Sequence, residues 1–269
     1  GLNLPEASIS ESPITKKDKE DLYNGLKCGV DFIALSFVKN GENIKELRQL
    51  INKEDSKAKI IAKVERHEAI NNLDDIIKES DGIMVARGDM GVEISFERVP
   101  IVQKDILRRC SKVGKPVIIA TQMMESMIQN YRPTRAEISD IANGVSYYAD
   151  ALMLSAETAV GAYPVEAVEA MTKTALLMEE YQYNNHKILP WWSPPGEVTQ
   201  VTHGITYAAN HLAELLNVSA IILFTMSGDT ARQVSKPRPN IPIFAFTPNI
   251  LVAHQMTLIR DVTPFLMKK

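Results

Sequence analysis

The sequence predicts an α/β fold made of consecutive parallel βα units, and three observations lead to this prediction. Five short apolar runs with β-branched residues alternate with longer stretches of helical periodicity. The runs begin between 23 and 34 residues apart, which is the length of a strand with its crossover helix. They are also apolar on both faces, as expected for the strands of a parallel sheet or barrel that helices cover from outside.

The same pattern locates each element. The expected strands are DFIALSF (31–37), KIIAKVE (59–65), GIMVARG (82–88), PVIIATQ (116–122) and ADALMLSAE (149–157). Apolar residues three and four positions apart predict the intervening helices ENIKELRQLINK (42–53), HEAINNLDDIIKES (67–80) and VPIVQKDILRRCSKV (99–113). After Pro133, the residues Thr134 and Glu137 form a capping-box pattern that predicts the start of a further helix.

Composition excludes several classes of protein. At 269 residues and 45% hydrophobic, the chain is large enough to bury a substantial core. Its net charge of −3, without a long basic block, argues against nucleic acid or anionic lipid as a partner. The longest apolar runs are too short to cross a bilayer, and the first residues lack the profile of a signal peptide. Cys28 and Cys110 lack CxxC spacing and fit a reducing compartment, so we expect a cytoplasmic protein.

Each expected strand ends in, or is followed by, polar residues. In parallel α/β architectures the ligand site lies at this carboxyl edge of the strands. The polar residues concerned are Ser36, Lys63, Glu65, Asp89, Thr121, Ser155 and Glu157. Five polar strand ends in step therefore predict a site at this edge.

Lys63 and Glu65 stand two positions apart, so an extended chain directs both side chains to one face. Ala62 and Val64 then turn toward the covering helices. A salt bridge at a strand terminus is the alternative interpretation of this pair. The polar ends of the other strands favour a functional site.

In VARGDMGVEI (85–94), Gly88 and Gly91 flank Asp89, which predicts a tight turn whose N–H groups can approach an anion. Glu65 and Asp89 would provide two hard oxygen ligands from neighbouring strand ends. Two such ligands are too few for a calcium cage. They suit a Mg²⁺ ion that also binds oxygens of the substrate.

Several segments resemble the pyruvate kinase family in their order and spacing. They are AKVER, MVARGDMGVE, ATQMMESM followed by RPTRAE, and ADALMLSAETAVGAYP. The resemblance runs from GLNLP near residue 3 to VTPFL near residue 265. It implies transfer of the phosphoryl group of phosphoenolpyruvate to ADP, giving pyruvate and ATP in the last step of glycolysis. It also implies a (β/α)8 barrel of the TIM type followed by a smaller α/β domain.

The resemblance implies roles for the residues of this edge that bind substrate and metal. Lys63 matches the lysine that faces the transferring phosphoryl group and the enolate oxygen, and Ser36 is expected to bind substrate beside it. Glu65 and Asp89 match the ligands of Mg²⁺ or Mn²⁺. Gly88 and Asp89 would offer backbone N–H groups to the carboxylate of the substrate.

Three further residues are implied in proton transfer. Thr121 matches the family hydroxyl beside the methylene carbon that must be protonated, and Ser155 with Glu157 matches a polar set in the proton route. Without the resemblance, Thr121 would be interpreted as a strand-ending residue whose hydroxyl bonds a nearby carbonyl. Met123, Met124 and other methionines nearby are expected to be packing residues.

Residues 1–180 are predicted to form the barrel domain, ending in a helix at 163–180. Residues 181–200, with three prolines and a Trp pair, predict a linker. A second α/β domain is expected at 201–269, with a helix near 203–216 and strands at SAIILFT (219–225) and PIFAFTP (242–248).

The turn MSGDTA (226–231) can cradle a phosphate group with N–H groups and hydroxyls. The resemblance implies a phosphorylated effector here, with the candidate residues Thr225, Ser227, Gly228 and Thr230. Asp229 would repel a phosphate, so its carboxylate turns outward, the activator differs, or the loop is only a helix cap.

The chain accounts for only about five of the eight βα units that close the family barrel. The first three strands, the lid domain, the K⁺ site and an arginine that grips the phosphoryl group are expected to be missing. We therefore expect a fragment that does not turn over alone, from a protein that the resemblance implies is a homotetramer. Two alternatives stay open. One is a catalytically silent module for effector binding or assembly, and the other is a Mg²⁺-dependent lyase that stabilises an enolate in a barrel.

Overall fold

The computed structural model describes residues 14–185, 201–239 and 241–267. Contacts divide the chain into a first unit, residues 1–110 with 117–122, and a second unit, residues 111–116 with 123–269. The domain boundaries near residues 180 and 200 remain predictions. Within the described ranges, we find no helix with the length and apolar character needed to cross a bilayer.

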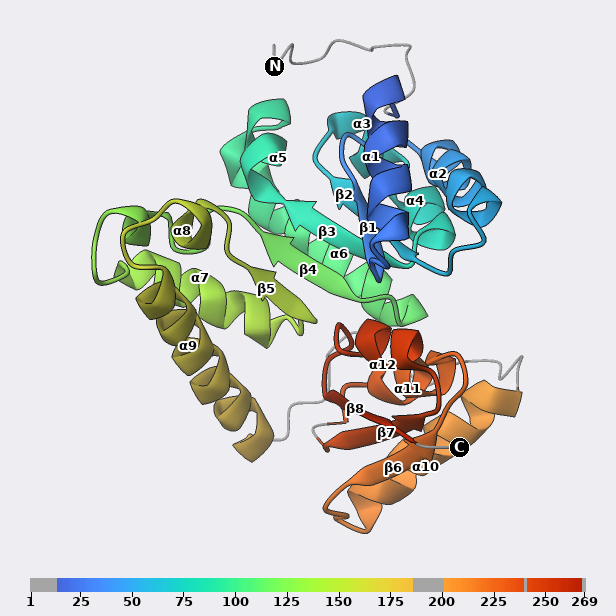
Figure 1. The fold of residues 1–269 in the computed structure, drawn as a ribbon. Helices are drawn as coiled ribbons and strands as arrows, with labels where there is room; N and C mark the ends of the chain where they lie inside the picture. The colour runs from blue at the N-terminus through green and yellow to red at the C-terminus, as the bar shows by residue number, and fades with distance from the viewer. Residues whose placement is uncertain (1–13, 186–200, 240, 268–269) are drawn as a thin grey trace. The chain divides into compact units, whose positions relative to one another are not determined.

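The first unit contains four parallel strands. They are β1 (Phe32–Leu35), β2 (Lys59–Val64), β3 (Gly82–Ala86) and β4 (Val117–Ala120). The strands lie side by side in chain order, with Leu35 opposite Ala62, and Ala86 opposite Ala120 (Figure 1). This parallel order confirms the predicted βα units, although each strand is shorter than its apolar run.

The helices that begin in the first unit alternate with these strands. They are α1 (Lys16–Lys27), α2 (Gly41–Lys53), α3 (His67–Asn71), α4 (Leu73–Glu79), α5 (Arg87–Glu93) and α6 (Val99–Val113), with a 3-10 turn, η1, at Phe96–Arg98. The helix α2 starts at Asn40, whose side chain accepts a hydrogen bond from the N–H of Asn43. Its buried face then packs beside α4 and β2.

The prediction of one helix over residues 67–80 is wrong at Asn72, where the backbone leaves the helical conformation and separates α3 from α4. Asn72 Nδ2 donates hydrogen bonds to the carbonyl oxygens of Glu68 at 3.0 Å and Lys39 at 2.9 Å. The break therefore ties α3 to the segment that follows β1. An asparagine side chain competes with the helical backbone in this way because its amide is short and polar.

The second unit begins with the remaining elements of the predicted barrel region. They are the 3-10 helix η2 (Glu125–Ile128), α7 (Arg135–Ser146), β5 (Ala151–Met153), α8 (Ala156–Ala159) and α9 (Pro164–Asn184). The capping box predicted at Thr134 and Glu137 is present at the start of α7. The helix α9 runs beyond residue 180 into the predicted linker, whose residues 186–200 lie outside the described part of the chain.

Glu137 does more than cap α7. Its carboxylate also accepts hydrogen bonds from the N–H of Ser126 at 2.8 Å and from Ser126 Oγ at 2.6 Å. Burial alone would raise the pKa of Glu137, but the hydrogen bonds from Ser126 and Thr134 hold its pKa below the ordinary range of glutamate. One carboxylate thus fixes both η2 and the first turn of α7.

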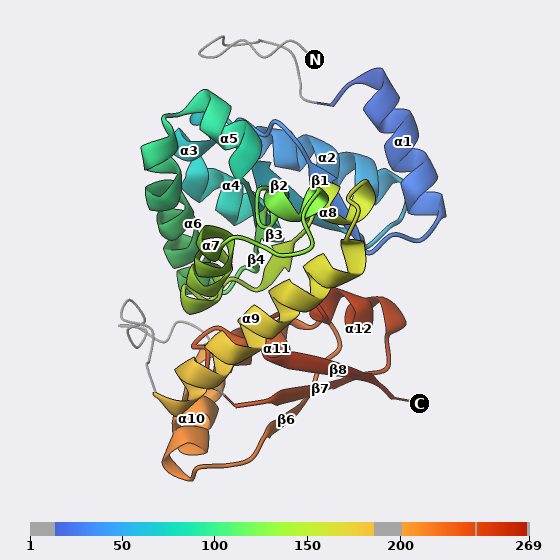
Figure 2. The ribbon, with the colours of Figure 1, turned by 90° about the vertical axis from the view of Figure 1, so that its left-hand side faces the viewer.

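The C-terminal part of the second unit is a small α/β layer. It contains α10 (Val201–Leu215), β6 (Ile221–Phe224), α11 (Asp229–Ser235), β7 (Ile243–Thr247), α12 (Ile250–Met256) and β8 (Val262–Leu266). The three strands are parallel and adjacent in chain order, and α11 and α12 cover one face of them (Figure 2). Leu223, Val234, Ala245 and Met256 belong to the core between these helices and strands.

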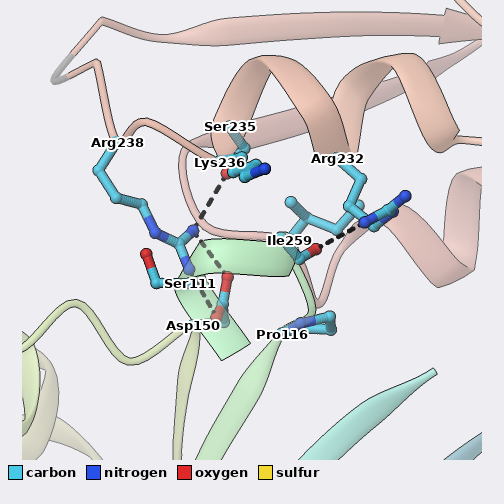
Figure 3. Close-up of a pocket in the computed structure, with 9 residues that line it drawn as sticks. Ser111, Pro116, Asp150, Arg232, Ser235, Lys236, Arg238 and Ile259 are labelled. Carbon is cyan, nitrogen blue, oxygen red and sulfur yellow. Dashed lines mark hydrogen bonds and ion pairs between the residues drawn. The ribbon is translucent and has the colours of Figure 1, made fainter. Parts of the chain in front are cut away.

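An ion pair inside the second unit joins the start of β5 to the segment after α11. Arg238 donates from both terminal nitrogens to the two carboxylate oxygens of Asp150, each at 2.8 Å, and both side chains are buried (Figure 3). Ser235 Oγ also accepts from Arg238, at 3.1 Å. The cavity beside this ion pair measures about 10 Å³ and holds at most one water molecule. It is therefore too small to bind a phosphate group.

Candidate active site

Three of the predicted site residues directly follow a strand of the first unit. Ser36 follows β1, Glu65 follows β2 and Thr121 follows β4. Because the four strands are parallel and adjacent, these ends share one edge of the sheet. Lys63 lies near the end of β2, opposite Met84 of β3. The structure therefore brings the polar ends of these strands to a common edge.

Lys63 and Glu65 lie on the same face, as their spacing predicts. Lys63 Nζ lies 2.6 Å from Glu65 Oε1 and donates a hydrogen bond to Ser36 Oγ at 2.9 Å. The Glu65 side chain is 1% exposed, whereas that of Lys63 is 23% exposed. The ammonium group is thus held by two neighbouring strand ends while part of it still reaches solvent.

The two oxygens of Glu65 have different surroundings. Oε2 accepts a hydrogen bond from the N–H of Phe37 at 2.8 Å. The buried Oε1 lies 2.6 Å from the Lys63 ammonium. Because each carboxylate oxygen has more than one lone pair, Glu65 can pair with Lys63 and still bind a hard cation such as Mg²⁺.

Asp89 is the second predicted metal ligand, and its side chain is exposed in the first turn of α5. No cluster of three His, Cys, Asp or Glu side chains able to hold a metal is present among the residues that the structure describes. A cation held by Glu65 and Asp89 would need further oxygen ligands from outside the chain. The donor set fits a metal that is shared with a substrate.

The predicted tight turn around Asp89 is wrong, because Arg87–Glu93 form the short helix α5 directly after β3. Neither Gly88 nor Gly91 has a positive φ. A Cβ atom at Gly91 would lie 2.8 Å from Cε1 of Phe96, whose side chain is exposed and can move aside. The N–H groups of Gly88 and Asp89 therefore belong to a first helical turn, where no intrahelical acceptor faces them.

Thr121 has both of its hydrogen-bonding functions engaged. Thr121 Oγ1 accepts from the N–H of Gly88 at 2.8 Å and donates to the carbonyl of Ala120 at 2.6 Å. Its φ is 68°, and Gln122 follows with φ 53°, so two consecutive non-glycine residues are left-handed. A β-branched residue rarely adopts this conformation, because its side chain crowds the backbone.

Arg87 is the residue of this edge that sequence reasoning missed. Its Nη2 donates to the carbonyl oxygens of Thr121 at 2.8 Å and Gln122 at 3.0 Å, and its Nε donates to Thr121 O at 3.2 Å. The Arg87 side chain is buried. Its partners lie 34 and 35 positions away, so no local pattern connects them to Arg87. The available signal is a charged residue at the end of an apolar run, where burial of a charge is unusual.

Ser155 and Glu157 lie in the second unit. Glu157 is 2% exposed, and its two carboxylate oxygens accept from the N–H groups of Met124 at 3.0 Å and Ser155 at 2.7 Å. Ser155 occupies the N-cap position of α8. Met123 and Met124 are fully buried, which confirms their expected packing role. Glu157 thus joins the segment after β4 to the segment after β5.

The predicted effector loop is closed by its own hydroxyl groups. Thr225 Oγ1 is buried and accepts from the N–H of Gly228 at 2.9 Å, and Ser227 Oγ accepts from the N–H of Asp229 at 3.3 Å. Gly228, with φ 82°, takes the left-handed conformation that glycine tolerates best. The carboxylate of Asp229 pairs with Arg232 one turn later, so it is held within α11, and Thr230 follows it in the first turn.

Comparisons with known proteins agree on a single family. The model of the pyruvate kinase barrel domain matches residues 1–168, and the model of the pyruvate kinase alpha/beta domain matches residues 203–269. Pyruvate kinase 2 of Synechocystis sp. is 45% identical over 267 residues, which cover 99% of this chain and 44% of that protein. Pyruvate kinase of Staphylococcus aureus is 46% identical over 268 residues, covering 100% of this chain and 46% of that protein.

A solved structure extends the similarity to three dimensions. The crystal structure of a pyruvate kinase from Cryptosporidium parvum superposes with a TM-score of 0.91 at 40% identity, covering 98% of this chain and 55% of that chain. This chain spans about half the length of the relatives it matches. Because the barrel model alone matches more than half of the chain, the chain belongs to the pyruvate kinase family.

Proposed function

We propose that this chain takes part in the transfer of a phosphoryl group from phosphoenolpyruvate to ADP, giving pyruvate and ATP. The observation that carries the proposal is the Lys63 ammonium, which lies between the Ser36 hydroxyl and the buried Glu65 carboxylate at the carboxyl edge of the strands. Phosphoryl transfer depends mainly on alignment and on stabilisation of charge. A fixed cation with access to solvent is the group that such a reaction needs.

Lys63 would face the transferring phosphoryl group and the enolate oxygen that remains. At an effective dielectric constant of about 20, two unit charges roughly 4 Å apart interact by about 4 kcal/mol. If this energy is realised only in the transition state, it corresponds to roughly three decades in rate. The ion pair between Lys63 and Glu65 keeps the ammonium group in place before substrate binds.

Glu65 and Asp89 would hold Mg²⁺ or Mn²⁺, which when bound would neutralise charge on the phosphoryl and carboxylate oxygens of the substrate. The resemblance also implies K⁺, for which we assign no ligand in this chain. The buried carboxylate of Glu65 at the carboxyl edge of the strands supports the assignment, because Mg²⁺ prefers charged oxygen ligands. Ser36 and Lys63 would orient the same substrate from the neighbouring strand.

Proton transfer to the enolate would use the hydroxyl of Thr121, and the resemblance implies that Ser155 and Glu157 also take part. The bond between Gly88 N–H and Thr121 Oγ1 bears on this assignment. A substrate carboxylate that took the N–H groups of Gly88 and Asp89 would replace Thr121 as acceptor. The Thr121 hydroxyl would then be released from Gly88 and could turn toward the methylene carbon.

Family membership also suggests regulation and assembly. We propose a homotetramer in the cytoplasm and a phosphorylated effector at Thr225, Ser227, Gly228 and Thr230. The hydroxyls of Thr225 and Ser227 already receive the N–H groups of this loop, so an effector would have to displace these bonds or use Thr230 and other donors.

The experiment is calorimetric titration of phosphoenolpyruvate into the chain with and without Mg²⁺. We expect Mg²⁺-dependent binding, with an affinity that falls at least about tenfold in Lys63→Met. The variant loses an ammonium group whose attraction to the phosphoryl group is worth several kcal/mol. Lys45→Met, which removes an exposed ammonium paired with Glu42, should bind like the parent chain. Equal affinity in parent and Lys63→Met would contradict the proposal.

A coupled assay of ATP formation tests whether these 269 residues turn over alone, which the sequence leads us not to expect. The two alternatives predict different results. A silent module would bind a sugar phosphate without Mg²⁺ and would not bind phosphoenolpyruvate. An enolate-stabilising lyase would exchange the methyl protons of pyruvate without nucleotide. Membership of the pyruvate kinase family favours neither alternative.

A further inference from the structure

We infer that Arg87 is a positioning residue, which fixes the place of the Thr121 hydroxyl by holding Thr121 and Gln122 in the left-handed conformation. The role in catalysis rests on the proposed function, because Thr121 is the proposed proton-transfer hydroxyl. The hold of Arg87 on Thr121 stands on contacts within the first unit alone. Arg87 itself is not expected to touch the substrate.

The first part of the inference concerns the backbone. Thr121 and Gln122 have φ values of 68° and 53°, which non-glycine residues adopt only when surrounding contacts impose them. The guanidinium of Arg87 supplies such contacts, since it donates to the carbonyl oxygens of both residues. The planar fork of arginine suits two convergent carbonyls, which a single ammonium would bind less well.

The second part concerns the side chain of Thr121. Its hydroxyl receives the N–H of Gly88, the residue directly after Arg87. Two successive residues at the end of β3 thus hold the backbone and the hydroxyl of one residue at the end of β4. With Arg87 removed, the left-handed pair can relax, and the hydroxyl would leave the N–H of Gly88.

The arrangement also explains why a charged residue is buried at this strand end. Arg87 is 9% exposed and lies between the buried strand β3 and the exposed Asp89. A buried guanidinium is costly unless its donors are used, and three of its hydrogen bonds go to the loop of Thr121. The burial is therefore coupled to the conformation of that loop.

The test measures amide hydrogen exchange of Gly88 by NMR, because the acceptor of this N–H is Thr121 Oγ1. Thr121→Val, which removes the acceptor, sets the exchange rate expected when the bond is absent. We expect Arg87→Lys to raise the exchange rate toward that value. The rise is about tenfold if the substitution shifts the opening equilibrium of the Gly88–Thr121 hydrogen bond by a factor of roughly ten. Arg108→Lys, at an exposed pair on α6, is the matched control and should leave the rate unchanged.

A rescue experiment separates positioning from a general loss of structure. Gln122→Gly relieves the left-handed strain, since glycine adopts positive φ without cost. It should therefore restore part of the Gly88 protection that Arg87→Lys loses. Arg87→Met serves as a second variant that removes the charge as well as the fork.

The outcomes can be told apart. Unchanged exchange of Gly88 in both Arg87 variants would overturn the inference, as would a rise in exchange at all amides without rescue by Gln122→Gly. If the parent chain binds no phosphoenolpyruvate while the exchange pattern is as expected, the proposed function fails and the hold of Arg87 on Thr121 stands. If the Gly88 exchange rate rose in Arg87→Met but stayed at the parent value in Arg87→Lys, the effect would be one of charge. That result would also overturn the positioning role.

Discussion

Arg238 binds Asp150 through two parallel hydrogen bonds of 2.8 Å, and both side chains are almost completely buried. The two residues are 88 positions apart in the sequence. Asp150 also accepts the backbone N–H of Arg260 at 3.1 Å. A bidentate pair of this kind has well-defined geometry, and its members are costly to separate.

We expect Asp150→Asn to lower the free energy of unfolding by about 3 to 5 kcal/mol, because it leaves the Arg238 charge buried without its partner. Arg238→Met should also destabilise, but the double variant should lose less than the sum of the two single variants. Urea denaturation of the three variants measures this coupling. Strict additivity would show that the two side chains do not depend on each other.

The metal assignment predicts that Glu65→Gln weakens Mn²⁺ binding by at least about tenfold, since an amide oxygen carries no charge for the ion. Glutamine can still accept the N–H of Phe37, so the loop after β1 should stay in place. Electron paramagnetic resonance of free Mn²⁺ gives the affinity. Glu68 lies on α3 and pairs with Arg66, so Glu68→Gln is the control. An equal loss of Mn²⁺ affinity in that variant would argue against a site at Glu65.

Glu137→Gln should lower the free energy of unfolding by about 1 to 2 kcal/mol, because hydrogen bonds to the charged carboxylate at the capping box and at Ser126 are weakened. The folded-state pKa of Glu137 is lowered, so its contribution is fully present above the ordinary glutamate pKa. It is lost as the pH falls through the lowered pKa of the folded state. The difference between parent and variant should therefore be largest near neutral pH and shrink on acidification.

Thermal or urea unfolding across this pH range measures the difference. Glu169→Gln, at an exposed position on α9, serves as the matched control. A constant difference between Glu137→Gln and the parent at every pH would contradict the role of the charge.

Thr225→Val should destabilise the C-terminal part of the second unit by about 1 kcal/mol, because the N–H of Gly228 loses its acceptor in a buried position. Thr230→Val, in the first turn of α11, should cost less. Denaturation followed by circular dichroism provides the comparison. If Thr225→Val were neutral, the cap at this loop would not contribute to folding, and the effector role would be the better explanation of its hydroxyls.

Much of the fold follows from local patterns in the sequence. The strands β1 to β5 lie within the five apolar runs, because a strand buried on both faces needs a continuous apolar segment. The capping box at Thr134 is also local, since both partners lie within one helical turn. The shared face of Lys63 and Glu65 follows from the two-residue period of an extended chain.

Other features could not be predicted in this way. The glycines of RGDMG suggest a turn by propensity, but Arg87–Glu93 form the helix α5, and the N–H of Gly88 in its first turn finds an acceptor at Thr121, 33 positions later. Asn72 breaks a helix whose apolar period continues through it, because its side chain finds an acceptor at Lys39, 33 positions earlier. In both places a contact made by the folded chain overrides the local preference.

The sequence by itself determined the order of strands and helices, the polar strand ends and the shared face of Lys63 and Glu65, because these depend on residues within a few positions of one another. Only the tertiary structure decided that Thr121 is left-handed, that Arg87 holds it, and that Arg238 neutralises Asp150. Each of these depends on segments that meet only after folding. A buried polar group takes whichever partner the fold places within reach, and periodicity along the chain does not identify that partner.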